Sequence, residues 1–379
     1  MQNLQMVDLK RQYLRMKPAI DEAIASVVES TAFINGGQVQ QFATALQNYL
    51  GVKHVIPCAN GTDALQIAMM ALGLKPGDEV ITPSFTYIAT VEVMALLNLT
   101  PVFVEVDERT FTMNPAEIEA KITSKTKAIV PVHLYGQSAD MAPILDIAAK
   151  HNLHVIEDDA QAIGGHYTFP DGTRKANGTM GIIGCTSFFP SKNLGCYGDG
   201  GAMFTNDDAL AQQLKMVANH GQSVRYYHDV VGCNSRLDTI QAAVLNVKLP
   251  HLDDYCSRRR AVAAHYDAAF ANHANIKTPA VAPYSYHVYH QYTLTLVDVD
   301  RDKVREALEA EGVPSMIYYP VPAHKQKMFA HFNVSDLHLP VTDYLTPRVI
   351  SLPIHTEMTE DELNYISTTV LNVINKLKA

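Results

Sequence analysis

His54-Val55-Ile56-Pro57-Cys58-Ala59 is an apolar stretch that runs directly into Asn60-Gly61-Thr62 and then into a helical pattern. The apolar positions of that pattern recur at the spacing of one helix face, and they are Leu65, Ala68, Met69 and Leu72. We therefore expect a strand, a tight turn and a helix in this order. This unit is the building block of a sheet whose strands run parallel.

The same order of elements returns along the following hundred residues. Apolar runs predict strands at residues 79–82, 101–105, 127–132 and 153–156, and helical patterns occupy residues 88–97 and 141–150. Asn114 followed by Pro115 is typical of a further helix start. Repeated units of this length predict an α/β fold, with a mostly parallel sheet covered by helices on both faces.

The length of 379 residues and a hydrophobic content of 47% allow one large core and a second, smaller one. We expect a large α/β domain over residues 1–250, which closes with a helix at 207–217 and the run 237–249. A long helical pattern from residue 251, a strand at 291–296 and helices at 301–311 and 360–377 predict a smaller α+β domain over residues 251–379.

Charge and hydropathy exclude several functional classes. A net charge of -9 disfavours nonspecific binding to nucleic acid or to an anionic membrane. Residues 1–8 lack the basic patch and apolar core of a signal peptide. The most apolar long stretch, residues 87–104, is interrupted by Glu92, Asn98 and Pro101, so it suits a helix and a strand better than a membrane span. We expect a soluble, cytoplasmic protein.

The metal-ligating residue types show no matching pattern. The 5 cysteines are an odd number without C-x-x-C spacing, which argues against both a disulfide framework and a zinc site. Of the 16 histidines, the pairs His151/His154 and His287/His290 have no neighbouring ligand set. We predict no metal.

Lys192 is the strongest candidate for chemistry. It lies in Ser187-Phe188-Phe189-Pro190-Ser191-Lys192-Asn193-Leu194-Gly195, between an apolar strand and a glycine-rich turn. An amine in this setting can be partly desolvated, lose its proton near neutral pH and attack a carbonyl to form a Schiff base. The alternative is a solvated loop lysine beside a core strand.

Two further candidate binding segments follow strand ends, and parallel sheets bind ligands at that edge. Asn60-Gly61-Thr62 offers backbone N–H groups and a helix dipole to a phosphate, although it could also be an ordinary helix cap. Glu157-Asp158-Asp159 places carboxylates where one could face a cationic ring nitrogen. With Lys192, these two segments supply what pyridoxal phosphate requires, which is an imine-forming lysine, an acid for the ring nitrogen and donors for the phosphate.

At these blocks the chain resembles the sugar aminotransferase family of DegT type, within the aspartate-aminotransferase fold class of pyridoxal phosphate enzymes. The resemblance covers nearly the whole chain. The blocks that carry it are residues 7–10, 59–65, 83–90, 157–161, the Lys192 segment and 234–238.

The resemblance implies a role for each matching residue. Lys192 would hold the cofactor covalently and move a proton between substrate and cofactor. Asp158 would pair with the pyridine nitrogen, and Gln161 would lie near the phenolic oxygen. Asp159 stands where many relatives have a small residue, so which aspartate would face the ring is left open. The alternation of side chains along the strand and the family pattern both favour Asp158. Tyr87 would stack on the ring, unless it is a core residue at a helix start.

The phosphate would be bound by Gly61, Thr62 and Ser187. In the family an asparagine of the second subunit completes this site, and Asn234 matches it, which implies a homodimer. Candidate contacts to the sugar or its diphosphate are Arg236, Arg225, Tyr319 and His324, with Lys325 nearby, although a solvated or core role is open for each.

The implied reaction is a ping-pong transfer of an amino group from L-glutamate to a nucleotide-linked ketosugar. Blocks 134–140, 185–201 and 220–222 look most like members that aminate C3 of a UDP-2-acetamido-3-keto-hexuluronic acid for surface polysaccharide such as lipopolysaccharide O-antigen. The alternatives are a C4 aminotransferase of a 4-keto-6-deoxy sugar and a noncatalytic regulator on the same scaffold. A nicotinamide dehydrogenase is disfavoured, because no strand is followed by G-x-G-x-x-G.

Overall fold

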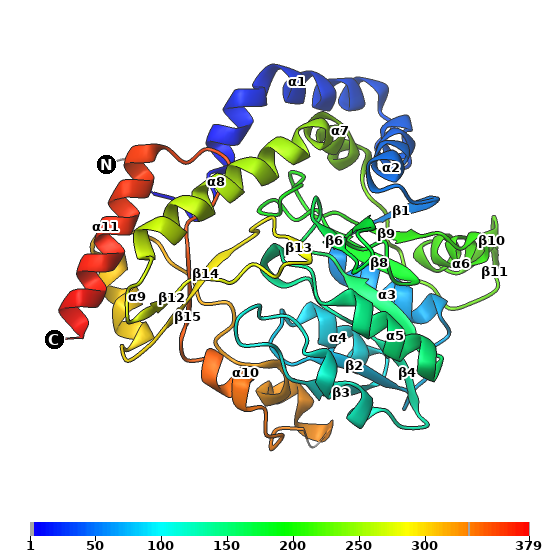
Figure 1. Ribbon diagram of the computed structural model, residues 1–379. Coiled ribbons are helices and arrows are strands. Elements are labelled where there is room, and N and C mark those ends of the chain that lie inside the picture. Colours follow the sequence, from blue (N-terminus) through cyan, green and yellow to red (C-terminus); the bar gives the residue numbers. More distant parts are fainter. Residues whose placement is uncertain (1–3, 333, 379) are drawn as a thin grey trace.

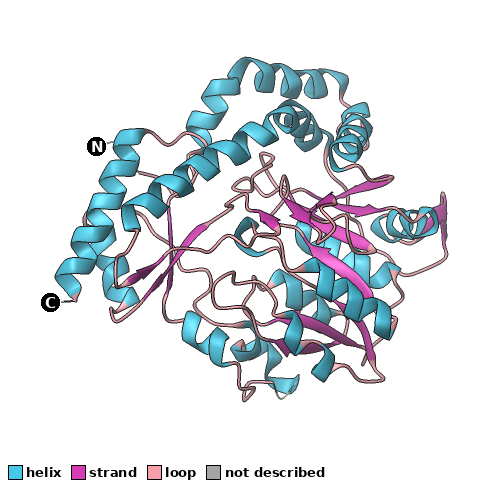
Figure 2. Ribbon diagram, in the orientation of Figure 1, coloured by secondary structure: helices cyan, strands magenta, loops and turns pink. Residues whose placement is uncertain are grey.

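The computed structural model describes residues 4–332 and 334–378. Its centre is a seven-stranded sheet in the order β1-β9-β8-β5-β4-β2-β3 (Figures 1 and 2). The strands, in chain order, are β1 (His54–Cys58), β2 (Glu79–Pro83), β3 (Thr100–Val104), β4 (Thr126–Ile129), β5 (His154–Asp158), β8 (Ile183–Ser187) and β9 (Gly201–Thr205). Only β9 runs antiparallel to its neighbours, β1 and β8, so the prediction of a mostly parallel α/β sheet is confirmed.

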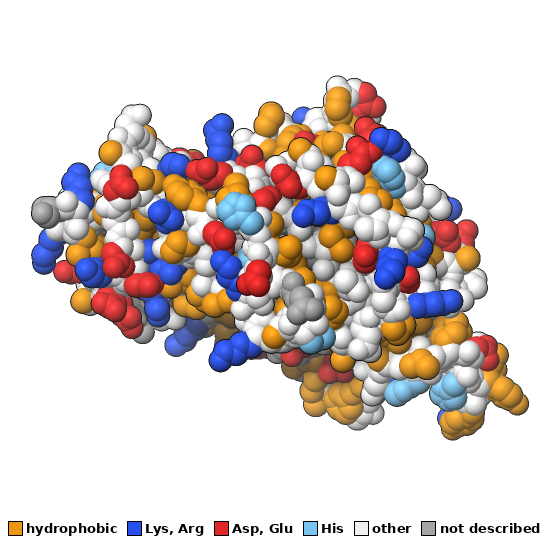
Figure 3. Space-filling model, turned by 90° about the horizontal axis from the view of Figure 1, so that it is seen from below, with side chains coloured by type: hydrophobic (Ala, Val, Ile, Leu, Met, Phe, Trp, Pro, Cys, Tyr) orange, Lys and Arg blue, Asp and Glu red, His pale blue; other side chains and the backbone are white. Residues whose placement is uncertain are grey.

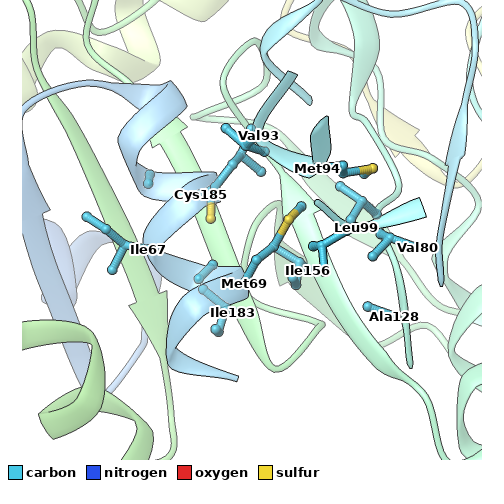
Figure 4. Close-up of a cluster of buried hydrophobic side chains, with 14 of the residues drawn as sticks. Ile67, Met69, Val80, Val93, Met94, Leu99, Ala128, Ile156, Ile183 and Cys185 are labelled. Carbon is cyan, nitrogen blue, oxygen red and sulfur yellow. The ribbon is translucent and has the colours of Figure 1, made fainter. Parts of the chain in front are cut away.

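Both faces of this sheet are apolar because neighbouring strand residues point to opposite sides. On one face, Val80, Ile156 and Cys185 pack under α3 (Gly61–Ala71), α4 (Ala89–Leu96) and α6 (Asp208–Ala218). Figure 4 shows this cluster, with Met69 of α3 and Met94 of α4 lying over the strand residues.

The opposite face of the sheet has two clusters. Ile81 and Val155 pack against α5 (Met141–His151). Val55 and Phe204, toward the β1 edge, pack against α2 (Gly37–Leu50) and α7 (Thr239–Lys248). Helices on both faces leave only the strand ends free for ligands, which is where parallel sheets bind them.

The C-terminal part of the chain has its own core. The antiparallel strands β12 (Ile276–Lys277), β14 (Tyr292–Leu296) and β15 (Val349–Leu352) form its sheet, and the helices are α8 (Leu252–Phe270), α9 (Arg301–Ala310) and α11 (Glu360–Leu377). In Figure 1 these elements lie together beside the central sheet, with α11 at the outer edge. The domain boundary at residue 250 stays a prediction.

The remaining elements are shorter or were not predicted. The sequence pattern missed α1 (Leu9–Ser30) and α2, and it did not resolve the small sheet of β6 (His166–Thr168), β7 (Arg174–Ala176) and β13 (Ser285–Tyr286), or α10 (Pro340–Leu345). The helix expected at Asn114 is a pair of short 3-10 turns, Pro115–Glu117 and Glu119–Lys121. Met1–Asn3, where a signal peptide was not expected, lie outside the described residues.

The hairpin of β10 (Gln222–Val224) and β11 (Tyr227–His228) lies at the edge of the molecule far from α11 (Figure 1). Within the described residues, no helix is long and apolar enough to cross a membrane.

Candidate active site

A pocket of about 630 Å³ opens where β5 and β8 end and α3 begins. Most of the residues that the sequence singled out line this pocket: Gly61, Thr62, Tyr87, Asp158, Gln161, Ser187, Lys192 and Tyr319. They come from segments far apart in the chain, so the fold brings the predicted segments together in one site.

One wall of the pocket is the start of α3. The Asn60 side chain accepts a hydrogen bond from the Asp63 N–H at 2.8 Å and so caps the helix, while Gly61 and Thr62 of the first turn line the pocket. A Cβ on Gly61 would lie 2.7 Å from the Ser187 Cβ, so only glycine lets the helix start approach β8 this closely. The helix dipole, backbone donors and the Ser187 hydroxyl fit a phosphate group.

Lys192 is half-buried in the turn after β8, where its N–H donates to the Phe189 carbonyl at 2.8 Å. Among the described residues, its ammonium has no ion pair or hydrogen bond. Burial lowers the pKa of Lys192 to about 8, although the carboxyls of Asp158 and Asp159 oppose this shift. A sizeable fraction of the side chain is therefore a neutral amine near physiological pH, as nucleophilic attack requires.

Asp158 lies at the end of β5 and lines the same pocket as Lys192, whose charge acts on it. Its carboxylate accepts hydrogen bonds from the Thr90 hydroxyl at 2.8 Å and from the Ala160 N–H at 3.1 Å. Burial raises the pKa of Asp158, and these two hydrogen bonds with the charge of Lys192 oppose the rise. A cationic ring nitrogen placed here would compensate the buried carboxylate.

The neighbouring acids point elsewhere. Of the two aspartates, Asp158 lines the pocket and Asp159 does not. The alternation of side chains along the strand had favoured Asp158. Both carboxyl oxygens of Asp159 are buried without a hydrogen-bond partner in the described structure. Burial, together with Glu157 and Asp158, holds its pKa well above the ordinary value. Glu157 is a structural anchor, because its carboxylate accepts the N–H groups of Met180 and Gly181, both at 2.6 Å.

The far wall is aromatic. Gln161 donates to the Tyr319 hydroxyl at 3.1 Å, and the rings of Tyr319 and Tyr87 lie 5.7 Å apart. Tyr87 keeps 52% of its surface exposed, so it is not a core residue and its ring can stack on a planar ligand.

The structure does not bring His324 into the pocket. Its side chain is fully buried, with Nδ1 paired to the Ser84 hydroxyl at 2.7 Å and the ring 6.3 Å from that of Phe103. The cause is the backbone bond from the Ala323 N–H to the Ser84 carbonyl at 2.9 Å, which turns His324 inward. A substrate contact by His324 therefore has no support here, and the neighbouring Lys325 pairs with Asp343 instead.

Three other predicted residues lie outside the pocket of their own chain. Arg225 is exposed on the β10–β11 hairpin, and Asn234 is exposed at its base, where it bridges to Asn219. Arg236 lines a separate hollow of about 310 Å³, with its guanidinium 3.4 Å from the Asn219 carboxamide oxygen. The predicted roles of these three residues in the cofactor and substrate site are therefore not met within one chain.

Sequence reasoning missed several residues of the site. Thr90 lies in the first turn of an apolar helix and carries no local signal beyond its hydroxyl. His290, Gln291 and Tyr318 line the pocket from the segments around β14 and before Ala323. No pattern near them in the sequence indicates this position.

Comparison with known proteins identifies the family. The model of the DegT/DnrJ/EryC1/StrS aminotransferase family matches residues 15–371, so the chain belongs to this family. It is 46% identical to a UDP-2-acetamido-2-deoxy-3-oxo-D-glucuronate aminotransferase of Pseudomonas aeruginosa, over 97% of this chain and 100% of that protein. It is 45% identical to a UDP-N-acetyl-3-dehydro-alpha-D-glucosamine 3-aminotransferase of Acidithiobacillus ferrooxidans, over 98% of each chain.

A solved structure agrees with this assignment. NtdA of Bacillus subtilis, with bound cofactor PMP, superposes with a TM-score of 0.91 at 30% identity and covers 99% of this chain and 86% of that one. The predicted family, fold and enzyme class are confirmed, and so is the pyridoxal phosphate type of cofactor, of which PMP is the amino form.

Proposed function

We propose that this chain transfers an amino group from L-glutamate to C3 of a UDP-2-acetamido-3-keto-hexuluronic acid, for surface polysaccharide such as lipopolysaccharide O-antigen. The observation that carries the proposal is the half-buried Lys192 amine, which forms no ion pair with an acid of the described residues and shares with Asp158 a pocket walled by the start of α3. Pyridoxal phosphate, when bound here, supplies a carbonyl that takes up the donor nitrogen and a ring that accepts electrons.

The side chains of this chain divide the remaining work. Lys192 would hold the cofactor and would move a proton between the substrate carbon and the cofactor carbon. Asp158, supported by Thr90, would keep positive charge at the ring nitrogen. The first turn of α3 and Ser187 would bind the phosphate, while Tyr87 would hold the ring face and Gln161 the phenolic side of the ring, since both residues line the same pocket.

Covalent labelling tests the cofactor assignment directly. Borohydride treatment of the isolated holoenzyme should fix the cofactor on the peptide that carries Lys192. Lys192→Ala should show no label and no transamination. It should still retain the cofactor noncovalently, through the phosphate contacts at the start of α3 and Ser187. Unchanged activity of Lys192→Ala would rule out this mechanism.

Support for C3 comes from the two relatives. Both are named for a 3-oxo or 3-dehydro sugar, but one sugar is a glucuronate and the other a glucosamine. The position of the keto group is thus the shared property, and the carboxylate at C6 needs its own test. We expect turnover with glutamate and the UDP-3-keto-uronate, with the new C–N bond located at C3 by NMR. A product aminated only at C4 of a 4-keto-6-deoxy sugar would overturn this choice.

We also propose that two copies share their active sites. The β10–β11 hairpin and the segment after it expose apolar side chains that a lone chain leaves in water, among them Val224 at 65%, Tyr226 at 76% and Val231 at 83% exposure. Figure 3 shows hydrophobic side chains gathered at the tip on the right of that face, where Figure 1 has this hairpin. Such a surface supports burial against a second copy. The partner's Asn234 would then complete the phosphate site, and Arg236 and Arg225 would meet the substrate diphosphate.

Mixing two inactive variants tests shared sites. Lys192→Ala keeps Asn234, and Asn234→Ala keeps Lys192, so a mixed dimer rebuilds one complete site. After unfolding and refolding of equal amounts together, activity should return to roughly a quarter of wild type, as random pairing in a twofold dimer requires. If each site belonged to one chain, the mixture would stay as inactive as its components.

A further inference from the structure

Tyr135 lies at a junction between the central sheet and the segment that carries Tyr318 and Tyr319. It follows β4 in a short 3-10 turn, Leu134–Gly136, and it is 2% exposed. Its φ of 59° is a left-handed conformation that bulky residues rarely adopt. A cost of this kind persists only where surrounding contacts determine the conformation, and it often marks a functional position.

The contacts of Tyr135 reach the pocket by two routes. Its phenol donates a hydrogen bond to the Tyr318 carbonyl, and its backbone N–H donates to the Gln161 side-chain oxygen at 2.7 Å. The Gln161 side-chain nitrogen then donates to the Tyr319 hydroxyl at 3.1 Å. Tyr135 thus holds the pair Tyr318–Tyr319 from both ends, once directly and once through Gln161.

The turn itself is fixed against a further pocket segment. A Cβ on Gly136 would lie 2.8 Å from the backbone nitrogens of Tyr289 and His290, and the Gly136 carbonyl accepts the Val288 N–H at 2.9 Å. Edge-on contacts with Phe111 and Phe85, at 5.4 and 6.5 Å between ring centroids, fix the Tyr135 ring. Tyr135 therefore has little freedom to release Tyr318.

We propose that Tyr135 is a positioning residue that holds the Tyr318–Tyr319 segment as a fixed wall for the ketosugar. Tyr135 does not line the pocket, whereas Tyr318 and Tyr319 do, so it acts through them. Burial keeps the pKa of the Tyr135 phenol well above its ordinary value, and the hydroxyl therefore remains a donor at every working pH. The part of the proposal that concerns the ketosugar rests on the proposed function.

Tyr135→Phe removes the bond to Tyr318 and keeps the ring in its aromatic surroundings. We expect the KM for the ketosugar to rise about tenfold, the effect of one lost hydrogen bond. The rate of the glutamate half-reaction and the cofactor absorbance should stay close to wild type, since Lys192 and Asp158 are untouched. Amide hydrogen exchange at residues 317–320 should accelerate, with or without any substrate.

Tyr266→Phe is the matched control. The Tyr266 hydroxyl is also buried and donates to a backbone carbonyl, that of Pro353, at 2.9 Å, but it lies in the C-terminal core and does not line the pocket. Both variants should lose similar stability, while only Tyr135→Phe should raise the KM and the exchange at residues 317–320. Equal KM and equal exchange at residues 317–320 in the two variants would overturn the proposal.

Tyr319→Phe cuts the second route, from the Tyr135 N–H through Gln161, and does not touch the buried Tyr135, so it remains usable if Tyr135→Phe fails to fold. It should also raise exchange at residues 317–320, and the double variant should raise it further than either single variant, because both routes are then cut. Wild-type exchange at residues 317–320 in Tyr319→Phe would count against the second route. If the wild-type chain shows no transamination, the proposed function fails, but the exchange measurement still decides the role of Tyr135.

Discussion

The Thr90 hydroxyl donates a hydrogen bond to the Asp158 carboxylate at 2.8 Å across a sequence separation of 68 residues. Both side chains are buried, so the bond is shielded from water. It favours the ionised form of a carboxylate whose pKa burial raises. The first turn of α4 thereby sustains the charge that a pyridinium nitrogen needs opposite it.

Removing this hydroxyl should slow catalysis without emptying the site. In Thr90→Val the pKa of Asp158 should rise further, and less of the carboxylate should be ionised. A hydrogen bond to a charged group contributes about 1.5–3 kcal/mol, so we expect kcat to fall roughly 10- to 100-fold. Thr90→Ser keeps the donor and should stay close to wild type in steady-state assays. Equal activity of Thr90→Val and Thr90→Ser would show that the bond is dispensable.

Cofactor uptake should depend on pH through Lys192. The amine attacks only when neutral, and its pKa is about 8, so the rate of Schiff-base formation by the apoprotein should climb as pH rises and level off above about 8. Rapid-mixing absorbance with added pyridoxal phosphate measures this rate. A free lysine derivative, whose pKa is ordinary, should show its rise only at higher pH. A protein profile that coincides with that of the free amine would contradict the desolvated environment.

Asp159 should limit stability at high pH. Its pKa is raised well above 3.8 in the folded chain, so the folded state favours the protonated acid, and stability falls as pH rises above the unfolded value. Asp159→Asn removes this loss. Its melting temperature should exceed that of wild type at pH 8, and the difference should shrink toward pH 4. A difference independent of pH would mean that Asp159 does not titrate in this way.

The close approach of α3 to β8 should not tolerate a side chain. In Gly61→Ala the new Cβ would meet Ser187 at 2.7 Å and push the helix start away from the phosphate position. We expect weaker binding of pyridoxal phosphate, measured by dialysis and absorbance. Gly37→Ala is the control, since a Cβ there would meet no atom of the described residues within 4 Å beyond its chain neighbours and its own helix backbone. Similar cofactor affinity in both variants would show that Gly61 does not shape the proposed phosphate site.

The part of the fold that the sequence predicted is the part encoded locally. The unit from His54 through Gly61 to Leu72 has its hydrophobic period and its turn residues within one segment, and the same holds for β5 and the end at Asp158. Lys192 and Asp158 could be singled out because each follows a strand end. Ligand sites of parallel sheets gather at that edge.

The remainder depends on contacts between distant segments. His324 resembles a surface histidine in its local sequence, and contacts with distant residues bury it, among them the bond to Ser84 across 240 residues. Thr90 and Tyr135 are similar cases, since neither residue type nor spacing indicates which carboxylate or carbonyl they meet. Arg236 and Asn234 lie outside the pocket of their own chain, so one sequence cannot show what they contact.

The pocket edge proposed for the cofactor phosphate is closely packed, because a Cβ on Gly61 would meet Ser187 and a Cβ on Gly201 would meet the Asn60 backbone. Tyr318 and Tyr319 line the pocket with side chains instead. Substitution of these two residues would therefore reshape the side proposed for the sugar while the proposed phosphate site is left intact. This division would let one scaffold change its sugar specificity while it keeps the same cofactor site.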